Sequence, residues 1–499
     1  MNKSGTVSIQ IISKHTGKYS VIKSLGSSRS PEEIERLERK AYFMIPDLMR
    51  QSSLPFLSEQ DKHIQNYFQT TDSIKVKVVG PELILGKIYN GIGYNRIEDE
   101  MFRHMVITRL VYPGSKLKTI DYLQRYQGRQ INKDELYRSM DKLISRYKQE
   151  VEQITYEQTK KVLGGIISMV FYDMTTIYFE SEDEDDFSMT GFSKDGKHSN
   201  PQIYLGLLVG MNGYPIGYQI FQGKISEGKT LVPVLKMFEE RFKLNKPIII
   251  ADAGLLSQKN IIYLEGEGYE YILGGRIKNE SERLKAEILA NKPKQDQATE
   301  IKRTEIQRLI ISYSANRARK DRYNREKGLK RLEKKLGSGK LSKKHVNNRG
   351  YNKYLMMNGE IKIEIDYEKF NDDQCWDGLK GYVTNTKLSR DEVMNNYNHL
   401  WQIEKAFRIS KTDLRIRPIY HRLKDRIEAH ICISFCAYSV FKELERILAV
   451  KSIQISPQRA IELTKTMYAI EYELPDSKLS KFTNVNFSEI QKQLLDIFA

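Results

Sequence analysis

The chain has 499 residues, of which 40% are hydrophobic, so it can build several domains with buried cores. It carries 81 lysines and arginines against 64 acidic residues, and this net charge of +17 favours a polyanionic partner such as nucleic acid. The longest apolar runs, residues 162–172 and 429–441, are too short to span a bilayer, and "MNKSGTVSIQ" lacks the apolar core of a signal peptide. We therefore expect a cytoplasmic protein without membrane contacts, in which the three cysteines are core thiols and not a zinc site.

The first 160 residues are predicted to form two regions. Residues 1–75 combine an alternating stretch, "VSIQII", with a charged helix that starts near Ser30. These patterns indicate no particular function for the region. Residues 76–160 carry helical patterns such as "KDELYRSMDKLISRYKQEVEQI" and a Pro-Gly turn at Pro113. We expect a helical unit there, and two interpretations stay open: a packing module and a unit that recognises DNA ends.

Residues 161–279 show a clear order of elements. "FYDMTTIYFE" is typical of a buried strand, and "YLGLLVGMNGYPIGYQIF" of a hairpin that turns at Asn212-Gly213. A helical stretch, the short strand "IIIADAG", a second helix and the strand "YEYILGGRI" follow. The order β-β-β-α-β-α-β predicts a mixed sheet flanked by helices.

The segment of residues 280–385 is strongly basic. Arg317–Lys344 holds thirteen lysines and arginines against three acids, a net charge of +10 in 28 residues. Such a run is often a solvated face, but this one lies between strand-like segments, so contact with phosphates is at least as well supported. We expect a β-rich basic insertion, and its candidate DNA-binding residues are Arg317, Arg319, Lys320, Arg322, Lys330 and Arg331.

A further helix is predicted from the capping box of Ser389 and Glu392. At about 100° per residue, one narrow sector of that helix contains Tyr397, Leu400, Trp401, Glu404, Arg408 and Lys411. Glu404 would then lie in the apolar stripe, where a charge requires a partner. Arg408 or Lys411 could pair with it, and a metal ion is the alternative.

Three carboxylates, considered together, indicate a metal site. Asp173 and Asp252 are expected on neighbouring strands, and Glu404 on a later helix. Such a set can converge on hard divalent cations, which prefer oxygen ligands. Two such ions, roughly 3.5 to 4 Å apart, stabilise the attacking and leaving oxygens of a phosphoryl displacement.

With these motifs the chain resembles the DDE transposases of bacterial insertion sequences, in the branch marked by a Tyr-x2-Arg-x3-Glu-x6-Lys signature. The signature reads "YNHLWQIEKAFRISK", with Tyr397, Glu404 and Lys411 at matching places and Leu400 at the place of the Arg. "FYDMTT", "IIIADAG", "GLKGYVTNT" and "RIRPIYHRLKDRIEAHI" belong to the same resemblance, which extends over residues 170–441.

The resemblance implies an α/β ribonuclease-H-like catalytic core. Residues 161–279 would form its first part and residues 386–450, with the Glu404 helix, its last part; residues 451–499 would be a C-terminal tail. Asp173 would bridge two Mg²⁺ ions, for which Mn²⁺ substitutes, while Asp252 and Glu404 would each complete the shell of one ion. The implied partners are the double-stranded DNA of element ends and target, and a second copy of the chain in a dimer or larger synaptic complex at the nucleoid.

The resemblance also assigns DNA contacts near the cleaved end. Tyr397 and Lys411 would contact phosphates, and Trp401 and Arg408 are included as DNA-binding candidates. In the family the signature Arg assists formation of a DNA hairpin, so Leu400 puts that step in question. Arg408, two turns on, is a candidate to replace it; loss of hairpin with retained nicking in Arg408→Ala would support this. Glu227, in "FQGKISEGKT", is either a supporting carboxylate or an ordinary loop acid.

Two other functions share these features. A catalytically inactive, transposase-derived DNA-binding protein would keep the basic surface and bind without cutting. A structure-specific nuclease with the same core would cut branched or hybrid substrates without joining ends. The presence of all three carboxylates favours an enzyme over the first, and the basic insertion favours a transposase over the second.

Overall fold

The structure is a computed structural model that describes residues 5–15, 17–52, 74–180, 184–185, 188–190, 199–243, 245–295, 297–348, 350–358, 362–473 and 480–498. The chain divides into two compact units, each described by itself: Met1–Lys75 with Ile470–Thr483, and Val76–Ala469 with Asn484–Ala499. Within the described ranges, no helix combines the length and the apolar character needed to cross a membrane.

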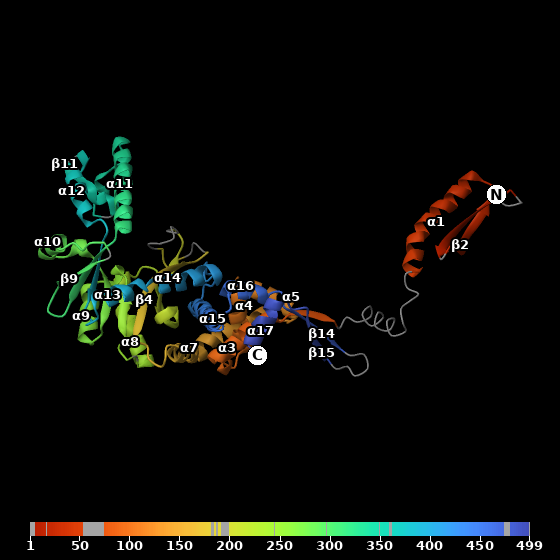
Figure 1. Ribbon diagram of the computed structural model, residues 1–499, viewed down its shortest axis with the longest axis horizontal. Coiled ribbons are helices and arrows are strands. Elements are labelled where there is room, and N and C mark those ends of the chain that lie inside the picture. Colours follow the sequence, from red (N-terminus) through yellow and green to blue (C-terminus); the bar gives the residue numbers. More distant parts are fainter. Residues whose placement is uncertain are drawn as a thin grey trace. The chain divides into compact units, whose positions relative to one another are not determined.

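The described residues of the first unit include a β-hairpin and a helix. The alternating N-terminal stretch forms β1 (Val7–His15), which pairs antiparallel with β2 (Lys18–Ser28). Helix α1 (Pro31–Ser52) contacts both strands, as Figure 1 shows. Three short strands lie near the boundaries of the units along the sequence: β3 (Lys75–Val78), β14 (Tyr468–Glu473) and β15 (Ser480–Val485).

The second unit is built on one mixed sheet with the strand order β6-β5-β4-β7-β8-β13-β10-β9. Strand β5 runs antiparallel to both of its neighbours, β4 and β6, whereas β4, β7 and β8 run parallel to one another. This order is that of a ribonuclease-H-like sheet, so the predicted fold class is confirmed. The strands are β4 (Met169–Tyr178), β5 (Gln202–Val209), β6 (Pro215–Gln222), β7 (Ile248–Ala251), β8 (Tyr271–Gly275), β9 (Ala298–Lys302), β10 (Arg308–Tyr313) and β13 (Leu379–Thr384).

The predicted hairpin is present between β5 and β6. Asn212 and Gly213 adopt φ values of 59° and 75°, in the left-handed region that asparagine and glycine tolerate best. The order β4, β5, β6, α8, β7, α9, β8 is the one expected from the sequence.

Alternate residues of each central strand face two different cores. On β4, Phe171 and Ile177 belong to one buried cluster, and Tyr172 and Met174 to the other. The second cluster is closed by α8 (Leu231–Phe242) and α9 (Gln258–Gly266). The first is closed by α13 (Arg390–Asn398), α14 (Trp401–Arg408) and α15 (Lys424–Val450). The sheet is therefore covered on both faces, and a residue's parity along a strand decides which face it serves.

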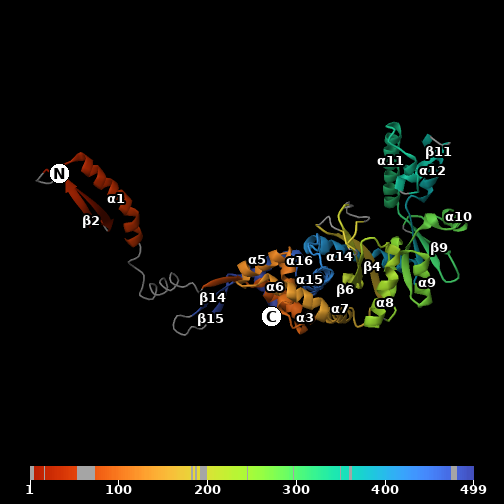
Figure 2. The same ribbon diagram turned by 180° about the vertical axis from the view of Figure 1, so that it is seen from behind.

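The helical pattern of residues 76–160 is confirmed as five helices that share the first core. They pack beside one another and α15, as Figure 2 shows. Cys432 and Cys436 of α15 are fully buried. The helices are α3 (Lys87–Ile92), α4 (Glu100–Val111), α5 (Lys116–Gln127), α6 (Lys133–Lys142) and α7 (Lys148–Val162), and α16 (Pro457–Thr464) and α17 (Glu489–Ile497) follow α15.

The basic segment differs in part from the expected β-rich insertion. Its charged run forms a long helix, α11 (Ala315–Gly337), and three of its strands, β9, β10 and β13, extend the central sheet. Helix α11 packs with α12 (Tyr367–Asp372) and the β11–β12 pair around Leu332, Tyr354 and Phe370 (Figures 1 and 2). Lys and Arg favour helices when no packing demand opposes them, which explains the difference. The remaining elements are α10 (Glu282–Ala290), β11 (Leu355–Asn358) and β12 (Lys362–Ile365).

Candidate active site

The two predicted aspartates lie side by side on parallel strands. The register of β4 and β7 pairs Phe171 with Ile250 and Tyr172 with Ala251, so Asp173 and Asp252 are the next residues on each strand. Both share parity with residues of the first core, Phe171 and Ile250, so they belong to the face covered by α13 and α14. The backbone N–H of Met174 donates to Asp173 and that of Ala253 donates to Asp252, at 2.7 and 2.6 Å.

Glu404 comes from α14, which packs against β4 and β5 on the same face. The prediction that Glu404 lies in a buried apolar stripe is wrong, because its side chain is exposed. The buried residues of α14 are Gln402, Ile403, Ala406 and Phe407. The projection fails because the chain does not form one regular helix there. Helix α13 ends at Asn398, α14 begins at Trp401, and a wider π-helical turn follows from Ile409.

The three carboxylates nevertheless meet in one pocket. Asp173, Asp252 and Glu404 all line a cavity of about 420 Å³, together with Arg317, Lys380, Tyr397, Leu400 and Trp401. Glu404 forms no ion pair with any described residue, so the expected pairing with Arg408 or Lys411 is absent from this part of the chain. An exposed, unpaired glutamate beside two aspartates is free to accept a cationic ligand.

Close backbone approach shapes the wall of this pocket. The hydroxyl of Tyr397 donates to Oδ1 of Asp252 at 3.2 Å, and burial together with that carboxylate raises the pKa of Tyr397. A Cβ atom on Gly274 would lie 2.5 Å from the Tyr397 hydroxyl and 2.7 Å from the backbone nitrogen of Ala253. Only glycine therefore fits at the end of β8, because any side chain would separate Tyr397 from Asp252.

Lys380 is a site residue that the sequence reasoning did not single out. It lies on β13 with the parity of Tyr382, a residue of the first core, and its Nζ is 4.4 Å from the centroid of the Tyr397 ring. Burial lowers the pKa of Lys380, and the nearby Arg317 lowers it further. The carboxylates of Asp252 and Glu404 act in the opposite direction and raise it. The sequence signal was a lysine inside the strand-like segment "GLKGYVTNT", because a charged side chain in a buried strand needs a partner that compensates its desolvation.

The donor set fits hard divalent cations, which prefer carboxylate oxygens. No three Asp, Glu, His or Cys side chains among the described residues are grouped closely enough to hold one ion together. A fourth carboxylate is near: a Cβ on Gly254 would lie 2.5 Å from Oε2 of Glu227.

The remaining signature residues lie around this pocket in different ways. Trp401 is exposed and lines the pocket, with Nζ of Lys405 6.0 Å from its ring centroid. Arg408 is exposed about two helical turns after Trp401 and is not among the lining residues. Lys411 is half-buried in the π-helical turn.

The basic candidates of α11 divide into one pocket residue and a surface. Arg317, in the first turn, lines the carboxylate pocket, whereas the others lie on the exposed side of the helix: Arg319, Lys320, Arg322, Lys330 and Arg331. Arg325 faces the opposite way; it is buried and pairs with Asp377 at 2.7 Å. The helix therefore presents one charged face to solvent.

The two histidines near α15 have structural surroundings. His430 is buried; its Nε2 lies 2.8 Å from the carbonyl oxygen of Ile416, and its Nδ1 is 3.4 Å from Arg109. Burial, with Lys116, Arg109 and Arg426 nearby, lowers the pKa of His421 to about 3. Neither histidine lines the carboxylate pocket.

Comparison with known proteins gives three findings. The family described as "Transposase DDE domain" matches residues 165–440, more than half of the chain. A curated relative, the "Transposase for insertion sequence element IS231E" of Bacillus thuringiensis subsp. finitimus, is 25% identical over 240 residues, which are 46% of this chain and 45% of that protein. The match thus spans less than half the length of this relative. A cryo-EM structure of a piggyBac transposase synaptic complex with hairpin DNA is similar with a TM-score of 0.40 and 10% identity, over 77% of this chain and 76% of that one.

Proposed function

The chain belongs to the Transposase DDE domain family, and from this premise we propose that it is the DNA transposase of an insertion sequence, which binds terminal inverted repeats and catalyses strand cleavage and strand transfer. The observation that carries the proposal is the meeting of Asp173, Asp252 and Glu404, from three separate elements, in one pocket. The strand register and the packing of α14 on β4 and β5 support it, because they position the three carboxylates independently.

Each carboxylate has a distinct place in the proposed site. Asp173, Asp252 and Glu404 would together hold the Mg²⁺ or Mn²⁺ ions, with Asp173 common to both ions. When bound, the ions supply an activated water and neutralise charge on the phosphate. Tyr397 keeps Asp252 oriented through its hydrogen bond, and Glu227 supports the loop after Asp252.

The partners follow from the charge of the surface. The exposed cations of α11, with Trp401, Arg408 and Lys411 around the pocket, bind the phosphates of double-stranded DNA. The helices of residues 76–160 are a candidate for recognition of the element ends. Paired-end cleavage requires two active sites, so we propose a dimer or larger synaptic complex that acts at the nucleoid in the cytoplasm.

The test is cleavage of a DNA fragment that carries the gene's own flanking ends, with Mg²⁺ or Mn²⁺, by the wild type and Glu404→Gln. We expect the wild type to cut at the ends, and the variant to bind with similar affinity and not cut. Binding without cutting by the wild type in either metal would instead indicate a transposase-derived DNA-binding protein. Cutting of branched DNA without end joining would indicate a structure-specific nuclease.

A further inference from the structure

The carboxylate pocket contains two cations that do not come from the signature helix. Leu400, at the signature's arginine position, lines the pocket with an apolar side chain. The cationic residues among the lining residues are Arg317, from the first turn of α11, and Lys380, from β13. The positive charge of the pocket is therefore supplied by the insertion and the sheet.

The ammonium group of Lys380 lies against aromatic rings at the wall of the carboxylate pocket. Its Nζ lies 4.4 Å from the ring centroid of Tyr397 and 5.2 Å from that of Tyr382. Asp252 and Glu404 favour its charged form electrostatically, yet Lys380 makes no ion pair within the described part of the chain. Cation–π contacts of this kind orient an ammonium group and leave its N–H donors available.

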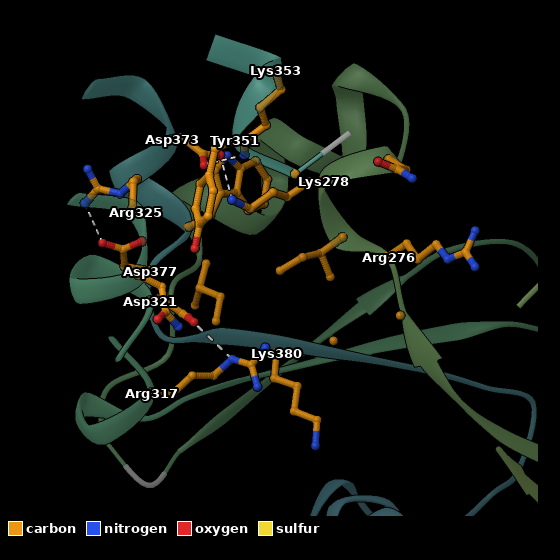
Figure 3. A pocket seen from close by; sticks show the side chains of 18 of the residues that line it. Arg276, Lys278, Arg317, Asp321, Arg325, Tyr351, Lys353, Asp373, Asp377 and Lys380 are labelled. Atoms are coloured by element: carbon orange, nitrogen blue, oxygen red, sulfur yellow. Dashed lines mark hydrogen bonds and ion pairs between the residues drawn. The ribbon is translucent and has the colours of Figure 1, made fainter. Parts of the chain in front are cut away.

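Arg317 brings a second positive charge to the same place. Figure 3 shows Arg317 and Lys380 in the lining of the neighbouring cavity, with the Lys380 side chain pointing away from Tyr351 and Lys353. The ion pair between Arg317 and Asp321 is long at 3.6 Å, and the Arg317 side chain is 48% exposed. Arg317 and Lys380 also line the neighbouring cavity of about 600 Å³, so they form the wall between the two cavities.

Two like charges in a partly buried wall repel each other, and an anion between them removes that cost. The acids of the neighbouring cavity balance this charge only in part. Asp373 pairs with Lys278 and Lys353, and Asp377 pairs with Arg325. Asp321 lies 3.6 Å from Arg317, and among the described residues no acid of that cavity pairs with Lys380. A phosphodiester has charged non-bridging oxygens that suit a lysine and an arginine together. The anion that fits this place, beside three metal-binding carboxylates, is the phosphate under attack.

Resting on the proposed function, we propose that Lys380, assisted by Arg317, binds a non-bridging oxygen of the scissile phosphate and so supplies the positive charge that Leu400 does not. In the hydrolytic step a bond forms between phosphorus and the water oxygen, and the bond between phosphorus and the 3′ oxygen breaks. The 3′ oxygen leaves with the electron pair and gains a proton through solvent. Lys380 and Arg317 transfer no proton; they stabilise the charge that develops on the phosphate oxygens.

The experiment measures single-turnover cleavage and equilibrium binding of the flanking-end DNA in Mg²⁺ by the full chain. We expect Lys380→Met to reduce the cleavage rate on the order of 100-fold, with DNA affinity nearly unchanged, because the contact strengthens in the transition state. Lys380→Arg should recover part of the rate. Lys387→Met, an exposed lysine in the loop after β13, is the matched control and should cleave like the wild type.

A modified substrate separates a phosphate contact from a structural role. Methylphosphonate at the scissile position removes the charge of one non-bridging oxygen, and each diastereomer is tested. We expect the diastereomer that slows the wild type to cause a much smaller further loss in Lys380→Met, since the contact is already absent. Equal losses in both proteins, or wild-type cleavage by Lys380→Met, would overturn this inference and leave the proposed function standing. Failure of the wild type to cleave would overturn both.

Discussion

Tyr397 and Asp252, which are 145 residues apart in the sequence, are joined by a hydrogen bond of 3.2 Å from the tyrosine hydroxyl to Oδ1 of the carboxylate. The bond connects α13 to the end of β7 and leaves the second oxygen of Asp252 for a ligand. The resemblance assigned this tyrosine a contact with DNA phosphate. In the structure Tyr397 is buried, 5% exposed, and its hydroxyl contacts the carboxylate.

Tyr397→Phe should therefore slow cleavage while DNA binding stays close to that of the wild type. A hydrogen bond to a charged group contributes about 1.5 to 3 kcal/mol, so we expect a decrease of roughly tenfold or more in the single-turnover rate. The matched control is Tyr323→Phe on α11, because that tyrosine is 60% exposed and lies outside the pocket. A weaker DNA affinity with an unchanged rate would show that Tyr397 serves as a phosphate ligand instead.

Gly274→Ala should also disturb the hydrogen bond between Tyr397 and Asp252, because residue 274 lies next to the Tyr397 hydroxyl. The new Cβ would meet the Tyr397 hydroxyl at 2.5 Å and the backbone of Ala253 at 2.7 Å, and the backbone cannot move aside easily. We expect a loss of about 1 to 3 kcal/mol of stability and a cleavage defect that resembles Tyr397→Phe. Gly266→Ala is the control, since nothing lies within 4 Å of a Cβ at that position. Normal cleavage by Gly274→Ala would mean that the wall is more adaptable than the structure indicates.

The exposed face of α11 should govern the salt dependence of DNA binding. The magnitude of the slope of log K for DNA binding against log [salt] decreases by about 0.9 for each phosphate contact that is removed. Arg322→Gln combined with Lys330→Gln should therefore decrease this magnitude by about 2. Binding titrations at several salt concentrations measure this slope. Lys236→Gln with Lys259→Gln, on α8 and α9, removes two equally exposed charges from the other face of the sheet and is the control. Equal slopes for the two double variants would assign α11 to a solvated surface.

Acidification should destabilise the protein in a pH window to which His421 contributes, together with His430 and His104, whose pKa values burial also lowers. The pKa of His421 is about 3 in the folded chain against a usual 6.5, so the unfolded chain binds the proton first and stability falls as pH drops below 6.5. Between pH 7 and pH 5 we expect a loss of about 1 to 2 kcal/mol from this group, measured by denaturant unfolding. His421→Gln should partly flatten this part of the curve.

A second loss of stability should follow only at lower pH. The pKa of Asp373 is about 2: partial burial raises it, but hydrogen bonds from Lys278, Lys353 and Tyr354 lower it by more. The stability that the Asp373 carboxylate contributes is therefore present above pH 3.8 and is lost as the pH falls toward 2. Between pH 5 and 6.5 Asp373 stays ionised, so it does not contribute to the change in the free energy of unfolding there. An unchanged slope in that range for His421→Gln would therefore contradict a contribution of His421 to the first window.

Local features of the sequence were sufficient for much of this fold. The Asn212-Gly213 turn, the capping box of Ser389 and Glu392, and the order of strands and helices from β4 to β8 are short-range signals, and the structure contains them. The family resemblance is confirmed by the match over residues 165–440. The choice of Asp173, Asp252 and Glu404 came from the same local motifs, and their roles stay a proposal.

Other features could be decided only when distant segments came together. A helical projection placed Glu404 in the apolar stripe because it assumed one continuous helix, whereas the break after Asn398 turned the residue toward solvent and the pocket. Lys380 is unremarkable among the chain's lysines until β13 takes its place in the sheet and brings it beside Tyr397, Arg317 and Asp252. The sequence determined which residues could bind metal and phosphate, because that depends on side-chain chemistry and local pattern. Which of them share one pocket was decided by sheet order and helix packing, because those depend on contacts between residues far apart in the chain.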